Sequence, residues 1–169
     1  MLQKVIDYLN KKGWSYSNAK DDEDIFISLS NYNGTYHCII YVKEDPKIFA
    51  FVSYLGTRCP LDKKERMLAL INLANDTMLY GNFEINALGE IKHRTSVYAD
   101  KFELTDEIID GVMLRNIYNI DAANPIFSKV MFGNITNEEA YYELFPFRKT
   151  ENKELEHKSA SLIENTPND

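Results

Sequence analysis

The chain has 169 residues and a formal net charge of −7. Its length fits one domain with a sizeable core. Hydrophobic residues make up 44% and charged residues 27% of the chain, globular values that argue against a disordered chain or a fibre. The acidic excess argues against nucleic acid as a partner, because phosphate binding draws on clustered Lys and Arg. We expect one domain over residues 1–146 and a polar, mobile tail over residues 147–169.

Cysteine content and hydropathy predict the cellular compartment of the protein. Cys38 and Cys59 are too few for a disulfide framework and suggest a reducing compartment. Residues 1–13 have charges every few positions and no apolar core, unlike a signal peptide. No apolar run approaches the roughly 20 residues that cross a bilayer. The sequence therefore predicts a cytoplasmic protein without a membrane partner.

The first third of the chain predicts a helix followed by a three-stranded meander. Apolar residues at helical spacing indicate a helix over residues 2–12, with Gly13 as its stop. Strands are expected over residues 25–30, 36–43 and 48–55. Asn33-Gly34 predicts a type I′ turn, which needs positive φ at both central residues.

A long helix is expected next, over residues 61–80. One side is apolar through Met67, Ile71, Ala74 and Met78, flanked by Leu68, Leu70 and Leu73. This arc is wider than one sheet contact requires, so other helices cover it or it lies at a subunit contact. Asn75 interrupts the arc and needs hydrogen-bond partners if it is buried.

The second half predicts a hairpin and then helices. Strands over residues 83–87 and 90–98 flank a Leu88-Gly89 turn. Thr105 is a suitable N-cap for the following helix, and Asn124-Pro125 is expected to restart a separate short helix. Thr136 with Glu139 predicts a capping box for a last helix. The fold class is therefore α+β, an antiparallel sheet in the order α-β-β-β-α-β-β-α-α.

No sequence motif identifies a reaction. Phosphate-binding glycine loops, a nucleophile elbow, a zinc-protease helix and paired zinc cysteines are all missing from the sequence. The histidines are interpreted as exposed or locally satisfied, with Lys92-His93-Arg94 on a strand surface. Cys59 is interpreted as a small buried hydrophobe. We therefore expect no catalytic residue, no metal, no cofactor and no enzyme activity.

Aromatic residues predict contact surfaces. The meander contains Tyr and Phe residues that strand alternation places on both faces, and an open aromatic face would mark a contact site. The alternative is that both faces are covered within the domain. The candidate partner-binding residues, from the meander and the long helix, are Tyr41, Phe49, Tyr54, Met67, Ile71 and Met78.

Several segments resemble the YbjN family of bacterial sensory transduction regulators. They are Lys12-Gly13-Trp14, residues 66–83 with LINLANDTMLYGNFEI, residues 104–112 with LTDEIIDGV, DAANPIF, and FGNITNEEAY at residues 132–141. The resemblance extends over about residues 2–142. It implies a fold similar to type III secretion chaperones, small acidic proteins that dimerise and hold an unfolded segment of a client.

Two functions follow as expectations. The first is a non-catalytic chaperone-like or regulatory module, a homodimer that binds a protein or peptide segment. The second is a small-ligand sensor or an enzyme with an unrecognised site between sheet and helices. That site would have to be lined by Asn75, Arg94, His93 or Cys59.

Overall fold

The protein is described by a computed structural model over residues 1–18 and 24–149. These residues form one six-stranded antiparallel sheet in the order β1-β2-β3-β4-β6-β5, which confirms the predicted α+β class. The predicted tail lies outside the described residues from residue 150 onward. In chain order the elements are α1 (Leu2–Lys12), β1 (Ser17–Asn18), β2 (Ile25–Asn31), β3 (Gly34–Glu44), β4 (Lys47–Tyr54), η1 (Leu61–Lys63), α2 (Lys64–Thr77), β5 (Asn82–Ile85), β6 (Ile91–Tyr98), α3 (Asp106–Phe132) and α4 (Asn137–Leu144).

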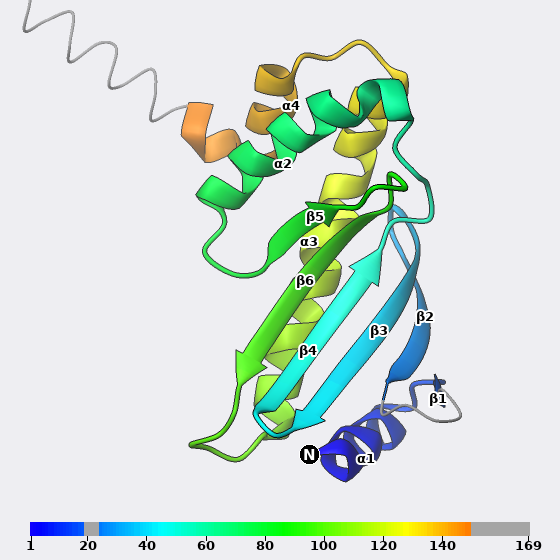
Figure 1. Ribbon diagram of the computed structural model, residues 1–169, viewed down its shortest axis with the longest axis vertical. Coiled ribbons are helices and arrows are strands. Elements are labelled where there is room, and N and C mark those ends of the chain that lie inside the picture. The colour runs from blue at the N-terminus through cyan, green and yellow to red at the C-terminus, as the bar shows by residue number, and fades with distance from the viewer. Residues whose placement is uncertain (19–23, 150–169) are drawn as a thin grey trace, which may run out of the picture.

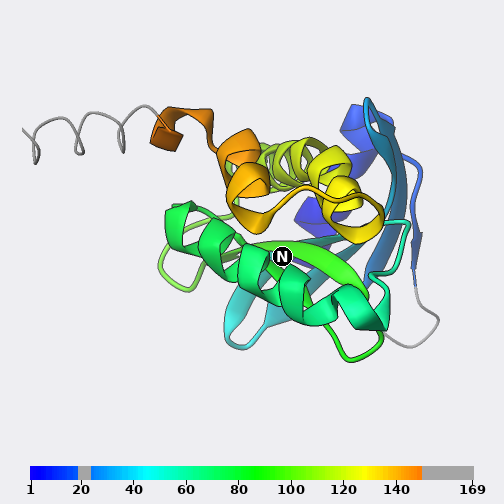
Figure 2. The same ribbon diagram turned by 90° about the horizontal axis from the view of Figure 1, so that it is seen from above.

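The helices divide the sheet into a covered face and an open face. Helix α3 lies along one face and packs on β4 and β6, as Figures 1 and 2 show. Helices α2 and α4 pack together at the upper end in Figure 1, where α2 also contacts β5, and α1 lies at the lower end. The core therefore sits between α3 and the sheet. Its largest fully buried side chains are Tyr8, Tyr36, Phe49, Phe51 and Phe127.

Charged contacts hold α1 against the start of α3. The Asp106 carboxylate accepts from Lys4 Nζ at 2.9 Å and Lys11 Nζ at 2.7 Å. The ammonium hydrogen bonds from Lys11 and Lys4 hold the pKa of Asp106 at about 2. Asp110 accepts from Lys12 Nζ and from the Tyr8 hydroxyl. These two acidic residues therefore have a structural role, and Asp106 also lies in the first turn of α3, where the helix dipole favours a negative charge.

The β2–β3 hairpin forms as predicted, but its turn is not type I′. Tyr32 and Asn33 connect the paired residues Asn31 and Gly34, and positive φ within the described residues occurs only at three other glycines. A Cβ at Gly34 would lie 2.7 Å from Nδ2 of Asn124 on α3, so a larger residue there would have to displace the Asn124 side chain. The conformation of the turn is thus set by its contact with α3.

Helix α3 runs through Pro125 without interruption, so the predicted restart at Asn124-Pro125 was wrong. Proline has no N–H to donate to the carbonyl four residues earlier, which belongs to Asp121. Asn33 Nδ2 donates to that carbonyl at 3.0 Å. The hairpin tip thereby satisfies the acceptor that proline leaves open, and the helix continues to Phe132.

The predicted helix over residues 61–80 is shorter than expected. It starts with the 3-10 turn η1 and continues as α2 only to Thr77, whose hydroxyl is 2.7 Å from the Tyr141 hydroxyl. Met78 is already extended. Asn75 explains the early end: its amide donates to Phe83 O at 3.0 Å and accepts from Phe83 N at 2.8 Å. By pairing with β5, Asn75 requires the chain to turn back to the sheet, and its predicted need for partners is confirmed.

The β5–β6 hairpin is confirmed with slightly shorter strands, and its Leu88-Gly89 turn packs against the loop before η1. Gly89 has a φ of 78°, and a Cβ there would lie 2.3 Å from the carbonyl oxygen of Cys59. Cys59 N–H donates to Gly89 O at 2.8 Å. Glycine is thus required both for the backbone conformation and for the close approach. The short strand β1, which pairs with β2, was not predicted.

Candidate binding surfaces

The open face of the sheet contains aromatic and apolar side chains. The strand register places Phe26, Ile39, Val52 and Arg94 in one row across β2, β3, β4 and β6. Phe26 is exposed, Ile39 is half-buried and Val52 is buried. No helix within the described residues lies over β3, β4 and β6 on this side (Figure 1). Of the two alternatives considered, the structure therefore favours a face without a covering helix, although its centre at Val52 is buried by neighbouring side chains.

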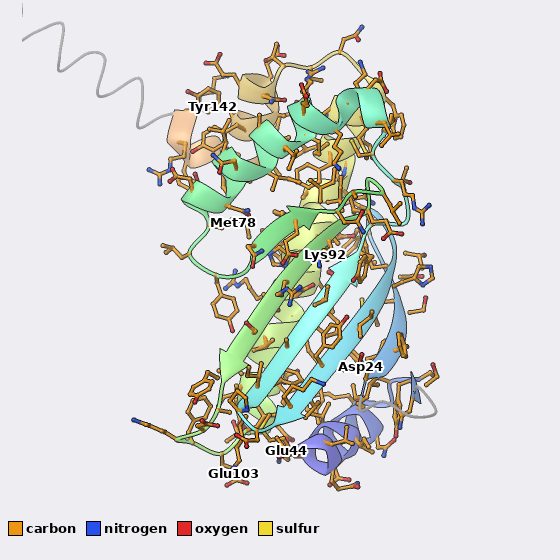
Figure 3. The ribbon with its side chains drawn as sticks, viewed as in Figure 1. Asp24, Glu44, Met78, Lys92, Glu103 and Tyr142 are labelled. Carbon is orange, nitrogen blue, oxygen red and sulfur yellow. The ribbon has the colours of Figure 1, made fainter. Side chains whose placement is uncertain are left out.

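Charges on this face occur at the β5–β6 side. Glu84 accepts from Lys92 Nζ and from Arg94 Nε, both at 2.9 Å, and Lys92 is labelled on β6 in Figure 3. Burial by itself would raise the pKa of Glu84, but the hydrogen bonds from Lys92 and Arg94 lower it. One carboxylate thus pairs with two cations at this side of the face. Much of the rest of the face is aromatic and aliphatic.

Three of the six predicted contact residues lie in the core. Phe49 and Met67 are fully buried and Ile71 is 5% exposed, so none of them can form a surface for a partner. Strand alternation turns Phe49 toward α3, and α2 is covered by α4 and α3, which account for its wide apolar arc. Tyr41 and Tyr54 are half-buried on the open sheet face, and Met78 is half-buried at the end of α2. Partner contact stays a prediction for these three.

Met78 is part of a groove of about 720 Å³ between the end of α2, the middle of α3 and the segment after α4. Figure 3 labels Met78 where the chain leaves α2. Leu79 is fully exposed beside it, and Tyr80 and Phe147 are also exposed. The lining of this Met78 groove is mostly apolar: Thr77, Met78, Leu79, Tyr80, Ile108, Gly111, Val112, Arg115, Asn119, Phe145 and Phe147.

The charged and amide side chains of the groove lie on its α3 side. Arg115 and Asn119 lie four residues apart, one helical turn, and share its wall with Ile108 and Val112. Arg115 is exposed and forms none of the ion pairs found among residues 1–18 and 24–149. The groove thus offers a guanidinium beside apolar surface, a combination that suits an apolar ligand with a carboxylate.

A buried polar network lies between α3 and the sheet, behind Asn119. Asn116 Nδ2 donates to Phe51 O and His93 O, both at 2.9 Å, and to Thr95 Oγ1 at 3.2 Å. Ser53 Oγ donates to Asn116 Oδ1. All the polar side chains of this network are buried. Asn116 therefore ties four polar groups of β4 and β6 to α3.

His93 lies in this network, and its predicted exposure was wrong. Its side chain is fully buried on the α3 side of β6, with its ring centroid 4.6 Å from that of Phe83 and the two rings tilted by 59°. Nε2 is 3.4 Å from Asn119 Nδ2, and Nδ1 has no hydrogen-bond partner within the described residues. Burial lowers the pKa of His93 to about 4, against a smaller opposing effect of Asn116. Lys92 and Arg94, its neighbours in sequence, do lie on the open face.

The residues considered for an unrecognised enzyme site do not come together. The Asn75 amide is hydrogen-bonded to the Phe83 backbone. Arg94 forms an ion pair with Glu84 on the opposite face of the sheet from His93. Cys59 is buried beside the Gly89 turn. Burial, followed by the charge of Asp62, raises the pKa of the Cys59 thiol, which disfavours a reactive thiolate. Within the part of the chain that the structure describes, no cluster of three or more His, Cys, Asp or Glu side chains could hold a metal ion.

Sequence reasoning missed most of the Met78 groove. Ile108, Val112, Arg115 and Asn119 were not considered as residues of a binding surface. A signal was present, because these four residues recur at intervals of four, three and four along one helical face. Phe145 and Phe147, which flank a proline, could also have been recognised as apolar residues beyond the last helix.

Two comparisons place this architecture among known proteins. Residues 2–113 match the YbjN family, described as "Putative bacterial sensory transduction regulator". The chain belongs to the YbjN family. The match covers α1, the sheet and the start of α3, and so includes part of the Met78 groove. No curated protein matches the chain significantly.

A solved structure supports the YbjN fold independently. It is titled "Crystal structure of YbjN, a putative transcription regulator from E. coli", with a TM-score of 0.55 and 14% sequence identity over 72% of this chain and 86% of that one. At this identity the likeness concerns the fold. No helix within the described residues is long and apolar enough to cross a bilayer.

Proposed function

We propose that this YbjN-family protein is a non-catalytic regulatory module that binds a segment of another protein in the Met78 groove. The observation that supports this most directly is the exposure of Leu79. Its side chain is fully exposed beside Met78, Tyr80 and Phe147. A cluster of exposed apolar residues around a groove is typical of a protein interaction site.

The chemistry of the groove suits an amphipathic helix or an apolar strand with an acidic residue. Met78, Ile108 and Val112 provide an apolar floor, and methionine adapts to differently shaped side chains. Arg115 at the edge would pair with a carboxylate of the segment. Binding by such a groove places apolar anchors at helical spacing against the floor.

Replacing Leu79 with Asp should abolish partner binding without affecting the fold. Leu79 is fully exposed, so an aspartate there loses little packing, but it places a charge in the apolar contact. We expect the partner's affinity to fall at least about tenfold, as for an interface anchor. The measurement is affinity capture from the native cell extract, followed by titration of the captured partner.

Leu88→Asp is the matched control. Leu88 is also an exposed leucine, but it lies in the β5–β6 turn and does not line the groove. Partner capture that L79D and L88D reduce equally, or that neither reduces, would contradict the proposed site. Thermal unfolding of both variants shows whether the fold is retained.

We also propose that the protein is a homodimer and that the open sheet face is the contact between its copies. Half-buried Tyr41, Tyr54 and Ile39 lie on this face together with exposed Phe26. Such a surface could be removed from water by a second copy. Light scattering over a range of concentrations should give twice the chain mass. A strict monomer at high concentration would exclude the dimer.

A small-ligand sensor is the second candidate, and the volume of the groove favours it. About 720 Å³ lies within the range of small-molecule pockets, roughly 300–1,000 Å³. The expected ligand is an apolar molecule with one carboxylate facing Arg115. Titration with decanoate separates the two functions: saturable binding that R115A abolishes supports a sensor, and absence of binding leaves the protein segment as the ligand.

A further inference from the structure

We infer that the Met78 groove binds the C-terminal residue of a partner chain, with the free carboxylate of that residue against Arg115. This inference rests on the proposed function of the groove and names the class of segment that it takes. Three features of the groove wall on α3 support it: a cation without an ion pair, an amide oxygen without a donor, and a glycine that leaves room beside the helix.

Arg115 is the only charged side chain among the groove residues that the structure describes. It is exposed and forms none of the ion pairs of residues 1–18 and 24–149. The chain as a whole has a net charge of −7, which repels anions at long range. A carboxylate in this groove therefore depends on direct contact with Arg115, whose planar guanidinium can donate two parallel hydrogen bonds to it.

Asn119, one helical turn after Arg115, presents the opposite kind of group. Its Nδ2 lies 3.4 Å from His93 Nε2, and burial keeps the imidazole neutral at pH 7 by lowering the pKa of His93 to about 4. Nε2 can therefore accept from Nδ2. Oδ1 of Asn119 has no hydrogen-bond partner within the described residues, and it is not one of the polar atoms that are buried without one. It is thus an accessible acceptor for an N–H group of a ligand.

These two groups together match the end of a polypeptide. A C-terminal residue has a carboxylate and an amide N–H on the same Cα, so it offers an anion to Arg115 and a donor to Asn119. Side chains one turn apart on a helix have their Cβ atoms about 5–6 Å from each other, which suits two groups on one residue. A fatty acid has the carboxylate but no N–H. An internal aspartate has both, but its chain must leave the groove in two directions.

Gly111 provides space for the chain end beside Arg115. It lies inside α3, where glycine is less favourable than alanine, and it lines the groove four positions before Arg115. A Cβ at this position would meet no atom within 4 Å, so packing within the described residues does not require glycine. Its missing side chain leaves the helix surface open to a ligand, while Met78 and Val112 offer apolar contacts for the last side chain of the partner.

Two matched peptide libraries test the requirement for a free carboxylate. Both are randomised at the last four positions, and one ends in a carboxylate whereas the other ends in a carboxamide. We expect the full-length protein to select apolar final residues from the first library. It should bind the best peptide at least about tenfold more tightly than the amide of that peptide, because a hydrogen bond between charged groups is lost.

Three results from these peptides would overturn the inference. The first is no selection from the carboxylate library, and the second is equal affinity for the carboxylate and the amide. The third is equally tight binding of a peptide with an amidated end and an internal aspartate, since the groove would then recognise a side-chain carboxylate.

Double-mutant cycles assign the two polar contacts. In R115A the carboxylate and the amide should bind equally, whereas K101A, which removes an exposed cation outside the groove, should keep the wild-type difference. N-methylation of the final residue removes its N–H and should weaken binding to wild type about fivefold, but should not weaken binding to N119L. A carboxylate preference that persists in R115A, or an N-methyl effect that persists in N119L, would overturn the assigned contacts.

Gly111→Met should block the groove without harming the fold. Methionine is the better helix former, and no atom lies within 4 Å of the new Cβ, so the midpoint of thermal unfolding should stay the same or rise. We expect peptide affinity to fall at least about tenfold in G111M and to stay within about twofold of wild type in G111A, the matched control. Undiminished binding by G111M would place the peptide elsewhere and overturn the inference.

The proposed function and this inference can fail separately. If L79D loses the captured partner but the carboxylate library yields no peptide, the groove binds an internal segment and only the inference fails. If R115A and G111M abolish binding of the selected peptide while partner capture is independent of Leu79, recognition of a chain end holds and the captured partner binds elsewhere.

Discussion

Replacing Asp121 with Ala is expected to lower the free energy of unfolding by about 3 kcal/mol. The buried Asp121 carboxylate accepts from Asn33 N–H at 2.9 Å and from the Tyr36 hydroxyl at 2.7 Å. Burial and this hydrogen bond raise the pKa of Tyr36 above its usual range, so the phenol remains a donor. Alanine leaves both donors without this acceptor. Urea unfolding measures the loss.

The effect should extend into the second half of α3. Asn33 also donates to the Asp121 carbonyl that Pro125 leaves free, so loosening the hairpin tip should increase hydrogen exchange in the helix around Pro125. Asn33→Ala should do the same, and the two substitutions together should cost less than their sum because they share one network. Asp76→Ala, an exposed aspartate on α2, is the control and should change stability by no more than about 0.5 kcal/mol. If D121A lowered the free energy of unfolding no more than D76A does, the proposed role of Asp121 in holding the hairpin tip to α3 would be disproved.

Acid should destabilise the fold through His93 before the carboxylates titrate. The pKa of His93 falls from 6.5 to about 4 on folding because the side chain is buried. Below pH 6.5 the unfolded chain therefore binds a proton at His93 that the folded chain does not bind. Stability is fully present above that value and is lost as the pH falls toward 4. The expected loss between neutral pH and about pH 5 is roughly 2 kcal/mol.

His93→Phe should flatten this pH dependence. Phenylalanine keeps a ring against Phe83, which lies 4.6 Å away, but cannot bind a proton. Urea unfolding at several pH values between about 7 and 5 measures the slope. His37→Phe, on the exposed face of β3, is the control and should keep the wild-type slope. A wild-type slope that survives in H93F would show that another group is responsible.

The burial of His93 also bears on the Met78 groove. The imidazole contacts Asn119, a groove residue, and lies beneath Gly81, where a Cβ would be 2.7 Å from its Cε1. Protonation of His93 would place a charge directly behind the groove wall. Binding of the partner or of decanoate should therefore be measured at pH 7. Measurements near pH 5 would combine ligand binding with partial unfolding.

Local features of the sequence determined most of the elements. Apolar spacing located α1, α2 and α3, and the Thr136 capping box with Glu139 located the start of α4. Gly13 ends α1 with positive φ, as its position predicts. These elements follow from interactions within a few residues, such as caps, turns and the alternation of strands. The α+β class and the order of elements could therefore be predicted.

Contacts between distant residues decided the rest. Asn33, 92 positions before Pro125, supplies the hydrogen bond that lets α3 continue, and Asn75 ends α2 by pairing with Phe83. Periodicity identified Phe49, Met67 and Ile71 as apolar but could not tell core from interface, because both require the same side chains. The Met78 groove arises only where α2 ends, α3 passes and the chain leaves α4.

The binding surfaces first expected were the aromatic meander and the helix after it. Sequence alone determined which residues were apolar enough to bind, and it placed Tyr41, Tyr54 and Met78 on elements that do have open surface. Only the tertiary structure decided which of their neighbours were free, because burial depends on what packs opposite, and that packing brings together residues far apart in the chain.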